Sequence, residues 1–373
     1  MKKICFVFGT RPEAIKLAPV IIELRKHPEF ELNVCVTAQH REMLDQVLDV
    51  FDIKPDVDLN LMKPDQTLSN LTAEAILRLD EYFKNYKPEL VFVQGDTTTV
   101  LAASLAAFYN KIKIAHVEAG LRTFDKSAPF PEEINRVLTS HIADLHFAPT
   151  EIAKSNLIKE GVPEKSILVT GNTVIDALLY AKDIVCKNPP EVPGIKKEIL
   201  NAEKQIILIT GHRRENFGEG FENICAALSE LADEFRDNYF IYPLHLNPNV
   251  RKPVNALLGN KKNILLIEPL SYLPFVYLMT KAKIILTDSG GIQEEAPSLG
   301  KPVLVMRDVT ERPEAVEAGT AKLVGTNKLN IISSVSDLIN NNSEYQKMTS
   351  ASNPYGDGYA TIKIVNSLIN NLL

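Results

Sequence analysis

The chain has 373 residues. A domain with a single hydrophobic core is usually shorter than this, so two domains are expected. Charged residues make up 24% of the sequence and hydrophobic residues 45%, which is the balance of a folded globular protein and excludes wholesale disorder. The net charge of -6 disfavours a protein that binds nucleic acid through bulk positive charge, and we expect no nucleic-acid partner.

No apolar run approaches the roughly 18 residues that a membrane span requires, so we expect no membrane partner. The N-terminal segment has an apolar run too short for a secretion signal, and it is typical of a first β-strand. The four cysteines are widely spaced and form no CxxC motif: Cys5, Cys35, Cys186 and Cys225. This usage favours buried free thiols and a cytoplasmic protein.

The first half of the chain alternates between strand and helix patterns. Short apolar runs over residues 3–8, 32–37, 90–94 and 112–117 predict buried strands of a parallel sheet. Between them, residues 41–52 have apolar side chains at helical spacing, and residues 98–109 form an Ala/Leu-rich helical pattern. Alternating strands and helices predict right-handed crossovers and a doubly wound sheet.

A break follows at residues 186–194 (CKNPPEVPG), where three prolines and a glycine indicate the neighbourhood of a linker. The alternation then restarts, with strands expected over residues 205–210, 238–242, 263–267, 283–287 and 302–306. The crossing between domains is expected between about residues 171 and 204. Two doubly wound domains would place the carboxyl ends of both sheets around one cleft, where such folds bind ligands.

Motifs that suit anionic ligands follow three of the predicted strands. Residues 8–16 (FGTRPEAIK) open a helix with Arg11 and Lys16 near its positive end. Residues 211–216 (GHRREN) place His212 at a strand tip, and residues 288–295 (DSGGIQEE) place paired glycines before a helix. Each motif could instead be an ordinary helix cap or a surface salt-bridge cluster.

Acidic side chains at neighbouring strand tips are the most informative feature. Asp96 ends one strand and Glu118 ends the next, and the helix that follows opens with Glu132 and Glu133 in its first turn. Singly, each could be a helix cap or a first-turn acid that the helix dipole favours. Two acids at neighbouring strand tips, in a crevice that also holds cations, favour proton transfer on a polar substrate. The seven histidines have no metal-binding spacing, so we expect no metal site.

The combination of motifs closely resembles the non-hydrolysing UDP-N-acetylglucosamine 2-epimerases of bacteria and archaea. The motifs occur in order along nearly the whole chain: FGTRPEAIK (8–16), GDTTT (95–99), HVEAGLRT (116–123), PEEINR (131–136), GNTVID (171–176), GHRREN (211–216), TDSGGIQEEAP (287–297), RPE (312–314) and NPYGDG (353–358).

The resemblance implies a GT-B-like α/β fold of two Rossmann-like doubly wound domains. We expect one domain over residues 1–171, joined by a C-terminal helix over 358–373, and a UDP-binding domain over 172–357. The implied reaction interconverts UDP-GlcNAc and UDP-ManNAc without a cofactor. It removes the hydrogen at sugar carbon 2, eliminates UDP to form 2-acetamidoglucal, and adds UDP back. We also expect a homodimer.

The resemblance assigns expected roles to individual residues. The catalytic candidates are Asp96, Glu118 and Glu132, with His212 near the diphosphate. Contacts to the UDP-sugar are expected from Arg11, Lys16, Asp96, Glu118, His212, Ser289, Gly290, Gly291, Glu295 and Arg312, with Phe275 and the backbone around Leu270 at uracil. A second UDP-GlcNAc could bind as an activator at Gln39, Glu132, Arg213 and His245.

Three alternative functions use similar residues. A hydrolysing 2-epimerase would release ManNAc and UDP, and a GT-B glycosyltransferase would share the nucleotide half but have little use for three acids together. A non-catalytic UDP-sugar sensor would not need them either. The sequence also departs from the family at Gln94, where many relatives have His, and at Leu270, where several have Gln. The second departure leaves only a backbone contact to uracil there.

Overall fold

The computed structural model describes residues 1–37, 41–63, 66–201 and 204–372, and it divides the chain into two compact units. The first unit consists of Met1–Ala177 and Tyr355–Leu373, and the second consists of Leu178–Pro354. The boundaries expected from the sequence, 171/172 and 357/358, lie a few residues from these divisions. Among the described residues, no helix is both long and apolar enough to cross a bilayer.

A parallel sheet in the order β3-β2-β1-β4-β5-β6-β7 forms the centre of the first unit. Its strands are β1 (Lys2–Phe8), β2 (Phe30–Val36), β3 (Val57–Asp58), β4 (Leu90–Gln94), β5 (Lys113–Val117), β6 (Leu145–Ala148) and β7 (Ile167–Val169). Strand β1 is buried from Ile4 to Phe8, because helices cover both faces of the sheet. The strand order reverses between β1 and β4, which pair directly.

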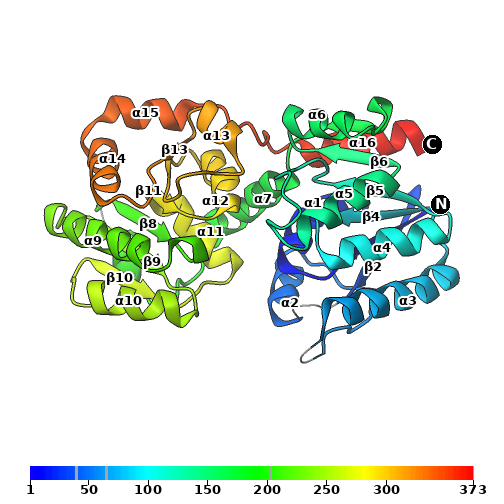
Figure 1. The fold of residues 1–373 in the computed structure, drawn as a ribbon, viewed down its shortest axis with the longest axis horizontal. Coiled ribbons are helices and arrows are strands. Elements are labelled where there is room, and N and C mark those ends of the chain that lie inside the picture. The colour runs from blue at the N-terminus through cyan, green and yellow to red at the C-terminus, as the bar shows by residue number, and fades with distance from the viewer. Residues whose placement is uncertain (38–40, 64–65, 202–203, 373) are drawn as a thin grey trace. The chain divides into compact units, whose positions relative to one another are not determined.

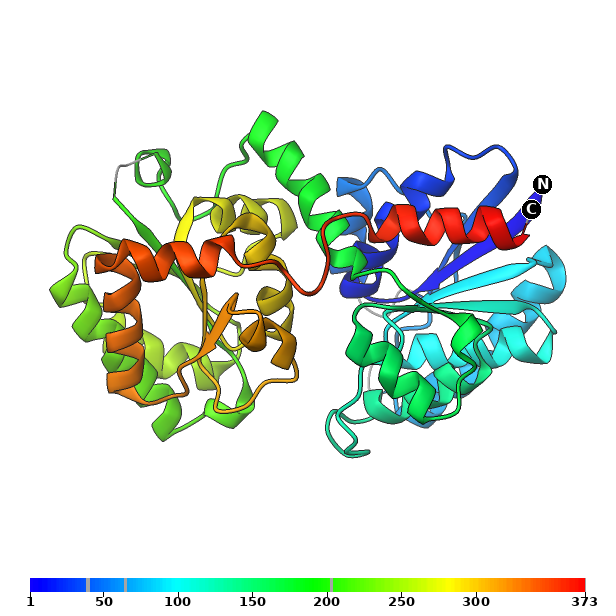
Figure 2. The same ribbon diagram turned by 90° about the horizontal axis from the view of Figure 1, so that it is seen from above.

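The helices of this unit form a layer on each face of the sheet (Figures 1 and 2). On one face, α1 (Arg11–Leu24) packs against α2 (Arg41–Val50) and against the last helix of the chain, α16 (Ala360–Leu372). On the other, α4 (Thr98–Tyr109) packs between α3 (Leu68–Tyr86) and α5 (Glu132–Ile142). Buried alanines of α4 allow this close packing. Helix α6 (Glu151–Lys159) follows β6, and α7 (Thr173–Lys187) runs from the first unit into the second.

The second unit has a parallel sheet in the order β10-β9-β8-β11-β12-β13. The strands are β8 (Ile206–Thr210), β9 (Tyr239–Pro243), β10 (Ile264–Ile267), β11 (Ala282–Thr287), β12 (Val303–Val305) and β13 (Ala321–Leu323). The helices are α8 (Lys197–Leu200), α9 (Glu219–Glu234), α10 (Pro248–Leu258), α11 (Tyr272–Lys281), α12 (Gly290–Glu295), α13 (Pro313–Glu317), α14 (Lys328–Asn340) and α15 (Asn342–Ser350). Helix α9 packs between α10 and α14 over an apolar core.

The expected fold class is confirmed, because each unit has a doubly wound parallel sheet and the pair corresponds to a GT-B-like α/β fold. The strands that were predicted from the sequence begin and end within two residues of the strands in the structure. The sequence analysis did not identify β3, β6, β7 or β13, which have at most four residues each and offer too short a pattern to recognise.

Candidate active site

The turns after β1 and β4 lie side by side in the first unit, because these strands are neighbours where the strand order reverses. This is the position at which open α/β sheets bind ligands. The first turn contains Gly9 and leads to Arg11, the first residue of α1. The second contains Asp96, directly before Thr97, which caps α4 by accepting a hydrogen bond from the backbone N–H of Val100.

A buried carboxylate joins these two turns. The Oε2 atom of Glu13 accepts the backbone N–H groups of Gly9 and Thr10 at 3.1 and 2.7 Å, and Oε1 accepts the hydroxyl of Thr97 at 2.8 Å. Burial raises the pKa of Glu13 above its ordinary value, and these hydrogen bonds oppose the shift. Glu13 was not among the expected site residues. Its signal is its position three residues after Thr10, the spacing of a capping box.

The three predicted acids of the first unit belong to one cluster, which also contains a lysine. Lys16 forms an ion pair with Glu118, whose Oε2 also accepts a hydrogen bond of 3.1 Å from Asn172 Nδ2. Asp96 lies within electrostatic reach of Lys16, Glu118 and Glu132. The structure therefore places the side chains from the ends of β4 and β5 and the start of α5 in one charged cluster.

The surroundings of Asp96 in this cluster perturb its ionisation. Burial raises the pKa of Asp96 above its ordinary value, and Arg136 opposes that shift most strongly among its neighbours. The carboxylates of Glu118 and Glu132 raise it further, because a second negative charge nearby disfavours ionisation. A carboxyl group held in this way can exchange a proton more readily near neutral pH than an exposed one.

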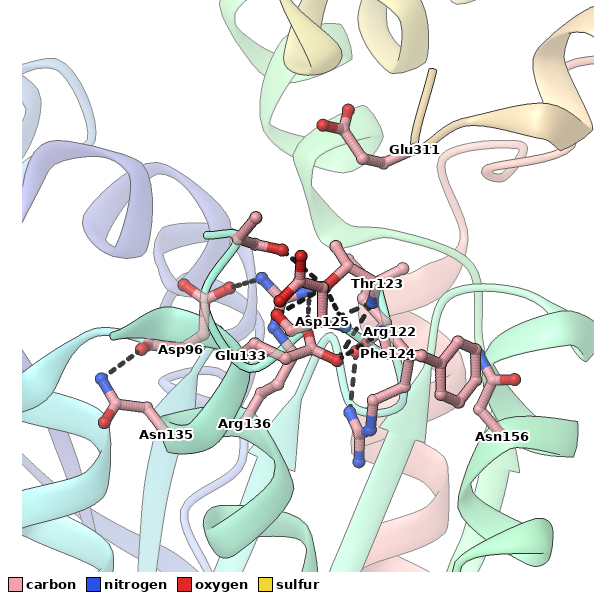
Figure 3. Close-up of polar contacts among 12 residues, drawn as sticks. Asp96, Arg122, Thr123, Phe124, Asp125, Glu133, Asn135, Arg136, Asn156 and Glu311 are labelled. Atoms are coloured by element: carbon pink, nitrogen blue, oxygen red, sulfur yellow. Dashed lines mark hydrogen bonds and ion pairs between the residues drawn. The ribbon is translucent and has the colours of Figure 1, made fainter. Parts of the chain in front are cut away.

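Helix α5 holds Asp96 in place (Figure 3). Arg136 forms an ion pair with the Asp96 carboxylate, and Asn135 Nδ2 donates to the Asp96 backbone carbonyl at 2.9 Å. Glu133, on the same helix, accepts the backbone N–H groups of Thr123 and Phe124 and lies 3.5 Å from Arg136. Of this helix, only Glu132 was among the expected site residues, because the roles of Glu133, Asn135 and Arg136 depend on contacts with distant turns.

The tip of β5 has an unusual backbone conformation, and a buried histidine side chain holds the tip of β4. Glu118 has a φ of +65°, a left-handed conformation that is uncommon for a residue with a side chain and recurs at functional sites. His116 is fully buried, and its Nε2 donates to the carbonyl of Gly95 at 2.7 Å. Burial lowers the pKa of His116 to about 3, so the ring stays neutral. His116 thereby anchors the turn that carries Asp96.

In the second unit, β8 and β11 are the neighbouring strands at which the order reverses. His212 follows β8, and the fully buried Asp288 follows β11. The Oδ2 atom of Asp288 accepts the backbone N–H groups of His212 and Arg213, each at 2.8 Å. The ring of His245, after β9, stacks on that of His212 with centroids 5.2 Å apart.

The expected nucleotide contacts of the second unit gather around α12. Ser289 occupies the N-cap position of this helix without a side-chain capping hydrogen bond, and Gly290 begins the helix. A Cβ on Gly290 would lie 3.6 Å from the guanidinium carbon of Arg312. Arg312 forms an ion pair with the buried Glu294. A Cβ on Gly291 would lie 3.4 Å from a carboxylate oxygen of Glu295. These residues therefore form one local group.

The other expected contacts are more dispersed. Phe275 lies on α11, and Leu270 lies in the segment between β10 and α11, both partly buried. Of the expected activator residues, Arg213 and His245 adjoin His212, whereas Glu132 belongs to the first unit. Gln39 lies outside the described residues.

Neither the acids nor the histidines of the described residues form a metal-binding group of three or more. The four cysteines are free, and Cys5, Cys35 and Cys225 are buried whereas Cys186 is exposed.

Comparison with known proteins decides the family. A family described as "UDP-N-acetylglucosamine 2-epimerase" matches residues 22–369. The chain belongs to this family. An Escherichia coli (strain K12) UDP-N-acetylglucosamine 2-epimerase is 56% identical over 375 residues, covering 99% of each chain. A Bacillus subtilis (strain 168) family member is 55% identical over 369 residues, covering 98% of this chain and 95% of its own.

Solved structures of the family have the same fold. The crystal structure of the Neisseria meningitidis UDP-GlcNAc 2-epimerase bound to UDP-GlcNAc has a TM-score of 0.89 and 56% identity, covering 99% of this chain and 100% of that chain. The Methanocaldococcus jannaschii epimerase, in complex with UDP-GlcNAc and UDP, has a TM-score of 0.81 and 39% identity over 99% of this chain and 100% of that chain.

Proposed function

We propose that this protein interconverts UDP-GlcNAc and UDP-ManNAc by anti elimination of UDP and its re-addition through 2-acetamidoglucal. Membership of the family supports UDP-N-acetylglucosamine 2-epimerase activity, and the bound UDP-GlcNAc in two relatives supports a UDP-sugar substrate. The observation that carries the mechanism is the cluster in which Asp96 interacts with Glu118, Glu132 and Lys16, and Lys16 pairs with Glu118.

The chemistry explains why several acids are needed. Carbon 2 of the sugar has no adjacent carbonyl, so its hydrogen leaves as a proton only if UDP departs from carbon 1. The proton must leave one face of the ring and return on the other, which requires two proton-transfer groups or one that reaches both. Asp96, Glu118 and Glu132 are our candidates. The assignment of one acid to each face stays open.

The remaining candidates bind and stabilise the nucleotide. In the first unit, Lys16 supplies positive charge beside the acids, and Arg11, at the start of α1, would add a second cation for the nucleotide. In the second, His212 and Arg312 would stabilise the charge of the departing diphosphate, since preorganised donors act most strongly where charge develops. Ser289, Gly290, Gly291 and Glu295 would bind the nucleotide, with Phe275 and the backbone at Leu270 at uracil.

The test is a reaction in deuterated water started from UDP-GlcNAc and followed by NMR. We expect UDP-ManNAc to accumulate to equilibrium and deuterium to appear at carbon 2 of both epimers. Complete retention of protium after many turnovers would contradict elimination. Free ManNAc and UDP in place of UDP-ManNAc would identify the hydrolysing reaction, and no turnover would favour a UDP-sugar sensor. Transfer of the sugar to an acceptor would identify a glycosyltransferase.

We further propose that a second UDP-GlcNAc activates the reaction through Gln39, Glu132, Arg213 and His245. Binding that favours the active conformation would raise turnover by differential affinity. The reverse reaction started from pure UDP-ManNAc should then show a lag that a trace of UDP-GlcNAc abolishes. Immediate turnover at the full rate without the trace would contradict this proposal.

A further inference from the structure

The carboxylate of Asp288 has one oxygen that its hydrogen bonds do not use. The Oδ2 atom accepts the backbone N–H groups of His212 and Arg213, whereas Oδ1 has no hydrogen-bond partner among the described residues. Asp288 is fully buried, so water does not compensate for the missing partner. The Nδ1 atom of His212 lies 3.6 Å from this Oδ1, just beyond hydrogen-bond distance.

A hydrogen bond from Nδ1 of His212 would give Oδ1 of Asp288 the partner that it lacks. A carboxylate only accepts hydrogen bonds, so Nδ1 must carry the proton that faces Asp288. We infer that Asp288 is a positioning residue for His212, which it holds in the Nδ1–H tautomer, so that Nε2 faces away from Asp288 and binds an anion when it too is protonated. The identity of the anion, the diphosphate of a UDP-sugar, rests on the proposed function.

The charges around His212 set its protonation before a ligand binds. Burial lowers the pKa of His212 below its ordinary value, Asp288 raises it, and His245 and Arg213 lower it. Tyr242 donates from its buried hydroxyl to the Gly211 carbonyl at 3.0 Å and adds no charge. The free ring is therefore neutral at neutral pH. An anion at Nε2 favours the imidazolium, and the second proton comes from the buffer.

Replacing Asp288 by Asn should change the tautomer of His212 and keep the shape of the turn. The amide oxygen of Asp288→Asn still accepts the two backbone N–H groups, but its NH2 group faces Nδ1 and needs an acceptor there. The neutral ring must then carry its proton on Nε2, as in catalytic triads where the same exchange leaves the geometry intact but selects the wrong tautomer. Tyr242→Phe is the matched control, because it removes a hydrogen bond from the same turn and leaves the Asp288 side chain in place.

The first measurement uses the ligand-free protein and imidazole nitrogen NMR, with the His212 signals assigned by their loss in His212→Asn. At about pH 8, where a histidine with an ordinary or lowered pKa is neutral, we expect the Nδ1–H tautomer in the wild type and in Tyr242→Phe. We expect the Nε2–H tautomer in Asp288→Asn. A wild-type Nε2–H tautomer, or no change in Asp288→Asn, would overturn the inference whether or not the protein binds a nucleotide.

The second measurement is calorimetry of UDP binding in buffers of different ionisation enthalpy. We expect the wild type and Tyr242→Phe to take up a proton on binding, and Asp288→Asn to bind with no uptake and at least ~10-fold more weakly, the scale of a lost charge-assisted hydrogen bond. UDP binding to the wild type without proton uptake would overturn the coupling. Absence of UDP binding would instead contradict the proposed function, and the tautomer measurement would still decide the role of Asp288.

Discussion

Glu13 and Thr97, from the turns after β1 and β4, are joined by a hydrogen bond of 2.8 Å between Oε1 and Oγ1. The same carboxylate holds the backbone N–H groups of Gly9 and Thr10. One buried side chain thus fixes the relative position of the turn that leads to Arg11 and the turn that carries Asp96. Asp288 does the equivalent in the second unit, where it joins the end of β11 to the turn after β8.

Removal of the Glu13 carboxylate should destabilise the first unit. Glu13→Ala leaves two buried N–H groups without an acceptor, which we expect to lower the free energy of unfolding by about 2 kcal/mol or more. Glu13→Gln should cost less than about 1 kcal/mol, because its amide oxygen accepts from Gly9 and Thr10 and its NH2 group donates to Thr97. Urea unfolding of both variants checks this. Equal losses would contradict the hydrogen-bonding role.

The clustered acids should be essential for turnover. We expect Asp96→Asn and Glu118→Gln each to lower kcat by at least ~10²-fold, the usual contribution of a general acid or base. Both exchanges are nearly isosteric, so the fold should survive. Glu151→Gln, on the exposed start of α6, is the matched control and should keep wild-type turnover. A wild-type rate in either cluster variant would remove that residue from the catalytic set.

Arg136 should control the pKa of Asp96 and thereby the acidic limb of the pH profile of kcat. Arg136 lowers the pKa of Asp96 against the raising effect of burial, so its removal in Arg136→Met lets that pKa rise further. If Asp96 accepts the proton as a carboxylate, the acidic limb of the kcat profile moves to higher pH. Arg136→Lys keeps the charge and should move the limb less. An unmoved limb in Arg136→Met would show that Asp96 does not control it.

The sequence allowed prediction of those features that depend on local pattern. The predicted bounds of β4 and α4 agree with the structure, because each is a run of apolar residues with a clear turn beside it. The cluster of Asp96 and Glu118 followed from the rule that parallel strands end at one edge of the sheet. The roles of Glu13 and Asp288 did not follow, because their partners Thr97 and His212 lie 84 and 76 residues away along the chain.

Gly120, directly after the β5 tip, should tolerate no side chain. It has a φ of +93°, and a Cβ there would lie 2.2 Å from the carbonyl oxygen of Ala153 on α6. We expect Gly120→Ala to cost about 3 kcal/mol or more, since both strain and overpacking contribute. Gly161 has a similar φ of +89° but no atom within 4 Å, so Gly161→Ala should cost only about 1–2 kcal/mol. Equal costs in denaturant unfolding would contradict the steric argument.

His116 should make the protein lose stability in mild acid. Its pKa is lowered by burial from 6.5 to about 3, so the native state holds the ring neutral while the unfolded state takes up a proton. The contribution of His116 is therefore complete above about pH 6.5 and is lost as the pH falls toward 3, with a slope of up to about 1.4 kcal/mol per pH unit.

In His116→Gln, the amide can still donate to the Gly95 carbonyl but does not titrate. Its unfolding free energy should consequently fall less steeply than that of the wild type through this window, whereas His141→Gln, at an exposed position, should follow the wild type. Parallel curves for the wild type and His116→Gln would show that the ring becomes protonated without unfolding.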